Sequence, residues 1–340
     1  MAPTDHPTAP GAHAPAADAP VLVLFETGPD GAPQPRLADP AVPHLLVTDQ
    51  GATRGDGLFE TALAVADADG VLSVRKLGAH LGRLAASAQA LQLPVPAAAD
   101  WERAIADGLD AHAAAGQVVP GERLTVKLTV TRGPEVPAGA APRPTAWVLL
   151  TPVPAVDPAD RRAGLRVLLL ERGLDSTAPE RAPWLLTGAK TLSYAVNMAA
   201  LRYAKAHDAD DVVFTSADGY LLEGPTSTVL IARRGEDGVR RLVTPLRQKG
   251  ILAGTSQAVV FAAAQAEGWA LGYGPLVPAD LDGIDGMWLA SSVRGVLPVR
   301  SVDGRELPVD LELTEHLQAW MDADADPGHH VTGDPVPDAA

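Results

Sequence analysis

The chain has 340 residues, and 27 lysines and arginines against 42 aspartates and glutamates give it a formal net charge of −15. It contains no cysteine, which excludes disulfides, thiolate metal ligands, iron–sulfur clusters and a cysteine nucleophile. The negative charge argues against a nucleic-acid partner, because a phosphate backbone would repel it, although a small anionic ligand needs only a local basic pocket. No stretch approaches the roughly 18 apolar residues of a membrane span, so no membrane partner is expected.

Both ends of the chain are expected to be disordered. Residues 1–20 are rich in Ala, Pro, His and Asp and show no apolar periodicity. They also lack the basic start and the apolar stretch of a secretory signal, so a cytoplasmic protein is expected. Residues 322–340 are acidic, contain prolines and have no Leu, Ile, Met or Phe. This stretch is therefore predicted to be a disordered tail.

Residues 21–151 are predicted to form an α+β domain. Short β-type runs and turn residues alternate here with two stretches of helical spacing. In chain order, the expected elements are strands at 21–25, 45–47, 58–66 and 71–74, helices at 76–93 and 101–115, and strands at 124–131 and 146–150. Residues 152–163 hold three prolines and several charges, which indicates a connection between two domains.

Residues 164–321 are predicted to form a mixed α/β domain. In chain order, the expected elements are a strand at 165–170, a helix at 190–207, strands at 211–215, 220–222, 229–232 and 241–244, a helix at 254–267, and strands at 287–291 and 296–299. One face of the helix at 190–207 is marked by Leu192, Val196, Ala199 and Tyr203. No repeat period is visible, which argues against solenoids and propellers.

A lysine at the start of the helix predicted at 190–207 is the first chemical feature. Lys190 stands in the run Thr-Gly-Ala-Lys-Thr-Leu-Ser-Tyr, beside small residues that let a planar group approach the backbone. A lysine that forms a Schiff base needs a helix end or a dry pocket to lower its pKa, and it needs space for the bound aldehyde. Taken alone, the same position is typical of a solvated surface lysine.

A carboxylate and three hydroxyl residues follow the turn predicted at 216–219. Glu223 lies in the run Leu-Leu-Glu-Gly-Pro, and Thr226, Ser227 and Thr228 come next. A carboxylate beside a pyridine nitrogen keeps that nitrogen protonated, so that the ring can act as an electron sink. Clustered hydroxyl and N–H groups suit a phosphate. The alternative is a solvated glutamate at a strand end, followed by a Ser/Thr turn.

Two further runs contain groups suited to an anion. Thr255 and Ser256 open the helix predicted at 254–267, where free N–H groups and the helix dipole favour an anion, unless they only cap the helix. Arg83 lies among apolar residues of the helix predicted at 76–93, and a guanidinium can bind a phosphate bidentately. Taken alone, it is equally typical of a surface arginine. The nine histidines show no metal-ligand spacing, so no metal site is expected.

In this order, the four runs together resemble the class IV aminotransferases, which bind pyridoxal 5′-phosphate (PLP) and have fold type IV. The resemblance covers about residues 45–300 and includes the run Gly-Asp-Gly-x-Phe before Thr61. It implies a D-amino-acid aminotransferase-like α/β fold, PLP as the cofactor of the C-terminal domain, and a homodimer. The family includes branched-chain and D-amino-acid aminotransferases, (R)-selective amine transaminases and 4-amino-4-deoxychorismate lyase.

The resemblance also implies a role for individual residues. Lys190 would hold PLP and act as the acid and base of the reaction, Glu223 would pair with the pyridine nitrogen, and Arg83 would bind the phosphate. The other implied cofactor-binding residues are Tyr194 near the ring oxygen and Thr226, Ser227, Thr255 and Ser256 in the phosphate cup. Ser193 and Thr228 depart from the family, in which asparagine is common at both positions.

Four residues are implied in substrate binding. Phe59 and Thr61 alternate with Glu60 on the strand predicted at 58–66, so they share one face. By resemblance, that face borders the substrate pocket. Arg54 and Arg294 are candidates for binding a substrate carboxylate, and each could instead be a surface charge.

The expected reaction is that of aminodeoxychorismate lyase, which forms 4-aminobenzoate and pyruvate in folate biosynthesis. The compact Leu-Leu-Glu-Gly run, the run from Lys190 to Ser193, and Thr61 resemble the lyase and D-amino-acid branches. The reaction would proceed through a Schiff base at Lys190 and removal of a proton from the carbon that bears nitrogen. The alternative enzyme is a class IV aminotransferase that combines a D-amino acid, branched-chain amino acid or (R)-amine with a 2-oxo acid. An alternative of a different class is a cofactor-binding regulatory or scaffold protein without catalysis.

Overall fold

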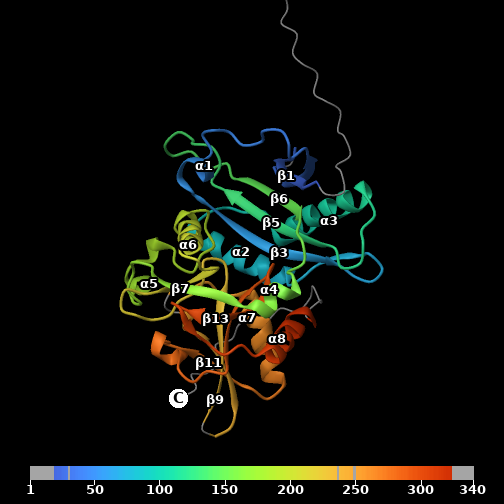
Figure 1. Cartoon of the computed structure of the whole chain (residues 1–340). Coiled ribbons are helices and arrows are strands. Elements are labelled where there is room, and N and C mark those ends of the chain that lie inside the picture. The colour runs from blue at the N-terminus through green and yellow to red at the C-terminus, as the bar shows by residue number, and fades with distance from the viewer. Residues whose placement is uncertain (1–18, 30, 236, 248–249, 324–340) are drawn as a thin grey trace, which may run out of the picture.

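The computed structural model describes residues 19–29, 31–235, 237–247 and 250–323. Two β-sheets covered by helices build the molecule, one from the N-terminal half of the chain and one from the C-terminal half (Figure 1). The predicted mixed α/β class is confirmed. The chain passes from the first sheet to the second between residues 152 and 165, and the exact domain boundaries stay a prediction.

The N-terminal sheet is antiparallel and has the strand order β2-β1-β6-β5-β3-β4. Its strands are β1 (Val21–Thr27), β2 (Pro33–Ala38), β3 (Gly57–Ala66), β4 (Leu72–Val74), β5 (Arg123–Thr131) and β6 (Thr145–Pro152). The helices of this half are α1 (Gln50–Arg54), α2 (Leu77–Leu91) and α3 (Ala98–Ala115). Because α2 packs on β3 and α3 packs on β1, β2 and β6, one face of the sheet is buried in an apolar core with Leu84 and Trp101.

Strand β3 sorts its side chains by the two-residue period of a strand. Leu58, Glu60 and Ala62 are fully buried on one face, whereas Phe59 and Thr61 are partly buried on the other. The shared face of Phe59 and Thr61 therefore agrees with the alternation in the sequence.

The C-terminal sheet is mixed and has the strand order β11-β10-β9-β12-β13-β7-β8, with β14 paired to β13. Its strands are β7 (Leu165–Glu171), β8 (Asp211–Thr215), β9 (Thr228–Arg234), β10 (Arg240–Pro245), β11 (Ala270–Gly274), β12 (Gly286–Ser291), β13 (Gly295–Val302) and β14 (Arg305–Glu306). Strand β7 is parallel to β8 and β13, and β10 is parallel to β11. The other pairs in this sheet are antiparallel.

Helices surround the C-terminal sheet. They are α4 (Pro158–Ala163), α5 (Ala178–Arg181), α6 (Ala195–Ala206), α7 (Thr255–Ala266) and α8 (Leu311–Ala323), with 3-10 turns η1 (Pro183–Leu185) and η3 (Pro278–Leu281). Helices α7 and α8 pack against each other over a core that contains Phe261, Trp288 and Leu317. None of the helices in the described ranges combines the length and apolar character that a membrane span requires.

Three predicted elements are wrong or misplaced. Residues 45–47 form a bend and the start of a turn instead of a strand, and Val47 is 90% exposed. The prolines at 40 and 43, just before this run, have no backbone N–H to donate to a neighbouring strand. Residues 220–222 contribute one isolated bridge, at Leu221, instead of a strand. The helix predicted to begin at Lys190 begins at Ala195, so Lys190 lies in a loop.

Several elements were not predicted, including β2, β11 and α8. Strand β2 contains two prolines and lies at a sheet edge, where a missing backbone donor is tolerated. Helix α8 continues through Asp322 to Ala323, so the tail predicted from 322 starts too early. The remaining tail residues and most of the predicted leader at 1–20 lie outside the described residues. The predicted connection at 152–163 contains α4, whose Arg161 donates to the carbonyl of Val296.

Candidate active site

A cavity of about 470 Å³ collects most of the site residues expected from the sequence. It is lined by β3, α2, the loop before α6, the loop before β9, the start of α7 and the turn after β12. The expected residues that line it are Phe59, Thr61, Arg83, Lys190, Tyr194, Glu223, Thr226, Ser227, Thr255, Ser256 and Arg294. These residues come from both halves of the chain, so the cavity depends on how the two sheets are assembled.

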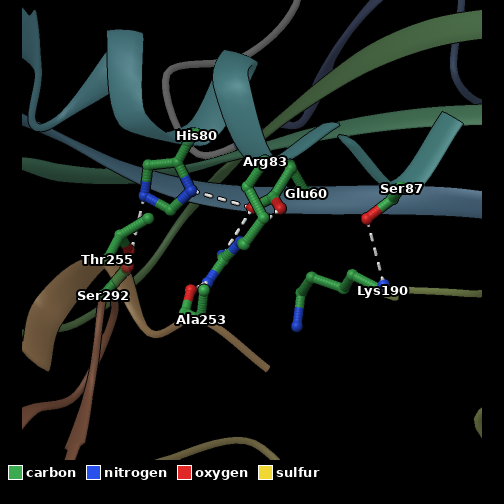
Figure 2. Close-up of polar contacts among 8 residues, drawn as sticks. All are labelled: Glu60, His80, Arg83, Ser87, Lys190, Ala253, Thr255 and Ser292. Atoms are coloured by element: carbon green, nitrogen blue, oxygen red, sulfur yellow. Dashed lines mark hydrogen bonds and ion pairs between the residues drawn. The ribbon is translucent and has the colours of Figure 1, made fainter. Parts of the chain in front are cut away.

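Backbone hydrogen bonds hold Lys190 in an extended segment beside β3. Its carbonyl accepts from the Phe59 N–H at 3.0 Å, and the Leu192 N–H donates to the carbonyl of Gly57 at 2.9 Å. On the other side, the Lys190 N–H donates to Ser87 Oγ on α2 at 3.2 Å (Figure 2). The position of the lysine is therefore set by a strand and a helix of the N-terminal half, and no helix start is needed.

Aromatic rings surround the amine of Lys190. Its Nζ lies 4.6 Å from the ring centroid of Phe59 and 5.6 Å from that of Tyr194, and the two rings meet edge to face. Among the described residues, no carboxylate lies within ion-pair distance of this Nζ. Burial lowers the pKa of the Lys190 amine, with the charges of Glu60 and Glu223 acting in the opposite direction. A lowered pKa increases the fraction of neutral amine, which is the nucleophilic form.

Glu223 faces the cavity with two donors on its carboxylate. Its Oε2 accepts from the Leu252 N–H at 3.0 Å, and its Oε1 lies 3.4 Å from Nη1 of Arg172. Burial raises the pKa of Glu223, whereas the Arg172 charge and the Leu252 N–H favour the ionised form. Arg172 lines the cavity and was not predicted, because it follows a strand without a recognisable motif around it. An ionised Glu223 carboxylate can accept a hydrogen bond from a protonated ring nitrogen, and Arg172 favours this ionised form.

The hydroxyl of Tyr194 is tied to the loop that follows Glu223. It donates to the carbonyl of Pro225, which also accepts from Asn197 Nδ2 at 2.8 Å. Burial and the Glu223 charge raise the pKa of Tyr194 to about 12, so this phenol stays protonated at neutral pH. The Tyr194 ring thus forms a fixed wall of the cavity beside Lys190.

One end of the cavity is suited to a phosphate. Thr255 and Ser256 form the first turn of α7, where backbone N–H groups and the helix dipole favour an anion. Within the described part of the chain, the buried hydroxyls of Ser227 and Ser256 have no hydrogen-bond partner. A Cβ at Gly254 would collide with Oγ1 of Thr228, so glycine keeps this approach to the helix open. Unpaired hydroxyls and N–H groups of this kind fit the phosphate of PLP.

Arg83 reaches the same end of the cavity from α2. Its Nε and Nη2 each donate to Glu60 at 2.7 Å, and its Nη1 donates to the carbonyl of Ala253 at 2.8 Å (Figure 2). Three of its five N–H donors are used in this way, which leaves the others for a ligand. Glu60 was not predicted to belong to the site. Its signal in the sequence is a carboxylate on the face of β3 that is otherwise occupied by Leu and Ala.

The two arginines expected to bind a substrate carboxylate occupy different surroundings. Arg294 lines the cavity, but its Nη2 donates to the fully buried Asp211 at 2.6 Å. Arg54 lies on α1 outside the cavity and pairs with Glu135 at 2.5 Å. Arg294 therefore lies in the same cavity as Lys190 and Glu223, whereas Arg54 does not. Both substrate roles stay predictions.

No group of three or more His, Asp or Glu side chains in the described ranges could hold a metal ion.

A family model described as "Amino-transferase class IV" matches residues 57–302 of the chain. The chain is 42% identical, over 274 residues, to a Mycobacterium tuberculosis protein named "Bifunctional aminodeoxychorismate lyase / D-amino acid transaminase". That match covers 80% of this chain and 90% of the relative.

Solved structures agree with the family match. The fold IV-transaminase CpuTA1 of Curtobacterium pusillum superimposes with a TM-score of 0.77 at 41% identity, covering 89% of this chain and 99% of that one. A hypothetical aminotransferase of M. tuberculosis in its PLP-bound form gives a TM-score of 0.77 at 38% identity, covering 90% and 98% of the two chains. The chain therefore belongs to the class IV aminotransferase family, a family of PLP-dependent enzymes with fold type IV.

Proposed function

We propose that the chain is a lyase that converts 4-amino-4-deoxychorismate to 4-aminobenzoate and pyruvate, a reaction of folate biosynthesis. The observation that carries this proposal is the Lys190 amine, whose pKa is lowered by its surroundings and which shares one cavity with Glu223 and the unpaired hydroxyls of Ser227 and Ser256. The M. tuberculosis relative, 42% identical, is named for this lyase activity together with D-amino acid transamination. Thr61, whose resemblance to the lyase branch supports the same choice, lines the cavity.

Different residues of the cavity have different proposed roles in the reaction. When bound, PLP supplies an electron sink for the electrons released at the carbon that bears the substrate nitrogen. Lys190 Nζ takes the proton from that carbon, and its position over the Phe59 ring keeps it in an apolar setting. Glu223 holds a proton at the ring nitrogen, with Arg172 beside it. Arg83 and the first turn of α7 bind the phosphate.

The two products form by elimination of the enolpyruvyl group from the ring carbon next to the one that bears nitrogen. Removal of the proton by Lys190 is followed by cleavage of the carbon–oxygen bond that joins the ring to the enolpyruvyl group. The ring becomes aromatic as 4-aminobenzoate, and the enol of pyruvate takes up a proton that Lys190 can return. No oxidant or reductant is required, because one molecule divides into two.

A second candidate function is transamination between a D-amino acid and a 2-oxo acid. It is favoured by the same Lys190 geometry, since both reactions begin with proton removal from the amine-bearing carbon. The M. tuberculosis relative carries both activities in its name, and a related structure from that organism, 38% identical, is described with α-ketoglutarate and PMP bound. Branched-chain amino acids and (R)-amines are the other amino donors to test.

One assay separates the two reactions. The purified protein, loaded with PLP, is supplied with 4-amino-4-deoxychorismate, and 4-aminobenzoate and pyruvate are measured. Formation of both products supports the lyase. Turnover of D-alanine with 2-oxoglutarate, without 4-aminobenzoate from the first substrate, would overturn the lyase and support the transaminase. A protein that binds PLP and turns over neither substrate would support the non-catalytic alternative.

We also propose that the chain forms a homodimer. The predicted apolar face of α6 is exposed in the single chain, where Val196 is 59% exposed and Tyr203 48%. Trp184 in the neighbouring turn η1 is 74% exposed. Several large apolar side chains exposed on one helix face and in the segment before it favour a surface covered by another protein. Light scattering coupled to gel filtration should give twice the mass of the 35.1 kDa chain, and a monomer at micromolar concentration would contradict the proposal.

A further inference from the structure

Glu60 is a buried charge on a strand face that otherwise carries apolar side chains. Its neighbours on this face of β3, Leu58 and Ala62, are fully buried, and Glu60 itself has no exposed surface. An unpaired carboxylate here would be strongly destabilising. Glu60 instead binds Arg83 bidentately and receives a third hydrogen bond from His80 Nδ1 at 2.8 Å (Figure 2). Three close donors thus compensate for the burial of this carboxylate.

The protonation states within this cluster follow from the contacts. Burial alone would raise the pKa of Glu60, but the charge and hydrogen bonds of Arg83, together with His80, lower it to about 2. Burial lowers the pKa of His80, which the Glu60 carboxylate partly opposes. A neutral His80 that donates from Nδ1 to Glu60 has a lone pair on Nε2. The tautomer of His80 is therefore set by Glu60.

A chain of polar contacts leads from His80 to the proposed phosphate cup. Ser292 Oγ lies 3.2 Å from His80 Nε2 and 3.3 Å from Oγ1 of Thr255. Because Nε2 accepts, Ser292 donates its single proton to His80 and accepts a hydrogen bond from the Thr255 hydroxyl. The backbone N–H groups at the start of α7 are then the donors left for a phosphate. Both hydroxyl residues line the cavity. This branch connects a strand of the N-terminal sheet to the first residue of α7.

A second chain of contacts leads from Glu60 through Arg83 to Ala253, two residues before Thr255. Arg83 is held by Glu60 and donates from Nη1 to the carbonyl of Ala253. One carboxylate thus holds Arg83 and, through His80 and Ser292, positions Thr255 at the start of α7.

We propose that Glu60, His80 and Ser292 are positioning residues that arrange the phosphate cup. This inference rests on the proposed function, in which the cavity holds PLP. It adds that Glu60 on β3 influences the affinity for the phosphate group through Arg83 and His80. If the cluster only supported the fold, its loss would weaken the binding of ligands with and without a phosphate to the same extent. A positioning role predicts weaker binding only for the ligand that carries the phosphate.

The test compares PLP with pyridoxal, which has the same ring and aldehyde and lacks the phosphate. Each is titrated into the protein after removal of its cofactor, and binding is followed by the visible absorbance of the ring. Ser292→Ala and His80→Gln should each weaken PLP binding about 5- to 10-fold, the effect of one lost hydrogen bond. The affinity for pyridoxal should not change. Ser292→Ala removes one partly buried hydroxyl, so it tests the inference even if the His80 variant does not fold.

A matched control is available in the same half of the chain. His112 is also buried and bonded to a glutamate, with its Nε2 at 2.6 Å from Glu122, but it does not line the cavity. His112→Gln should leave the affinities for PLP and pyridoxal unchanged. Equal weakening of PLP and pyridoxal by Ser292→Ala, or no weakening of either, would overturn the positioning role. Failure of the unsubstituted protein to bind either compound would instead overturn the proposed function.

Discussion

Arg83 and Ser87 lie four residues apart on α2, and they contact two different segments next to the same cavity. Arg83 donates to the carbonyl of Ala253 just before α7, whereas Ser87 accepts from the backbone N–H of Lys190 (Figure 2). Residues four apart on a helix share a face, so a single helix fixes the distance between the phosphate end and the amine end. One rigid helix therefore positions both Lys190, the proposed reacting lysine, and the proposed phosphate cup.

The effects of Arg83 and Ser87 on cofactor binding and on turnover should be separable in mutant kinetics. Ser87→Ala removes a buried acceptor and leaves the Lys190 N–H unpaired, at a cost of about 1–3 kcal/mol. It should lower kcat with little effect on PLP affinity, whereas Arg83→Ala should mainly weaken PLP binding. Steady-state kinetics at saturating PLP and a PLP titration check the pair. Loss of PLP affinity in both variants to the same extent would contradict this division.

Lys190 should be indispensable for either proposed reaction. Lys190→Ala removes the amine that accepts and returns the proton in the proposed mechanism. Lys127 Nζ also lies over the Phe59 ring, at 5.0 Å from its centroid, but Lys127 does not line the cavity. We expect kcat to fall by at least about 100-fold for the lyase and for the transaminase assay. Lys205 near the end of α6 is exposed and does not line the cavity, so Lys205→Ala serves as the control with unchanged kcat. Retention of activity in Lys190→Ala would exclude the mechanism.

Arg172 should influence the pH dependence of the reaction through Glu223. Its guanidinium lowers the pKa of Glu223, so Arg172→Gln should raise that pKa further. If the ionised carboxylate is the active form, activity is lost as the pH falls through the pKa of Glu223. The acidic limb of the pH–rate profile should then move to higher pH in Arg172→Gln. In Arg172→Lys, which keeps the positive charge, it should lie near its position in the unsubstituted protein. An unchanged acidic limb would show that Arg172 has no electrostatic influence on the reaction.

Glu60 should contribute to stability in a defined pH range. Its pKa falls from 4.5 to about 2 on folding, which corresponds to about 3 kcal/mol of unfolding free energy. A lowered carboxyl pKa stabilises the folded state above pH 4.5, and this stabilisation is lost as the pH falls toward 2. Urea unfolding of the cofactor-free protein should therefore show a smaller difference between Glu60→Gln and the unsubstituted chain at pH 3 than at pH 7. A difference independent of pH would argue against the ionised pair.

Two glycines near the cup should respond in opposite ways to alanine. A Cβ at Gly254 would collide with Oγ1 of Thr228, so Gly254→Ala should displace the start of α7 and weaken PLP binding. A Cβ at Gly82, next to Arg83 within α2, meets no atom within 4 Å. Gly82→Ala should leave PLP affinity unchanged and stabilise the helix by up to about 1 kcal/mol. Titration with PLP and thermal unfolding distinguish the two outcomes.

The residues with a local signature in the sequence were the ones that could be predicted. Lys190 beside small residues and Glu223 before a hydroxyl run each carry their chemistry in a short segment, and both line the cavity. The alternation of Phe59 and Thr61 with Glu60 also follows from the strand period. Arg172 has no such local pattern, because its role comes from the carboxylate that lies opposite it in space.

The sequence by itself therefore determined the family and the mixed α/β class, and it predicted the groups that are proposed to hold PLP. The tertiary structure decided which of these groups meet. It placed Lys190 in an extended segment against β3, left Arg54 outside the cavity, and joined Glu60 to His80 and Arg83. The physical reason is that a short motif specifies its own chemistry, whereas pairing between a strand and a helix depends on packing across many residues. A buried carboxylate such as Glu60 can be interpreted only after its partners are known.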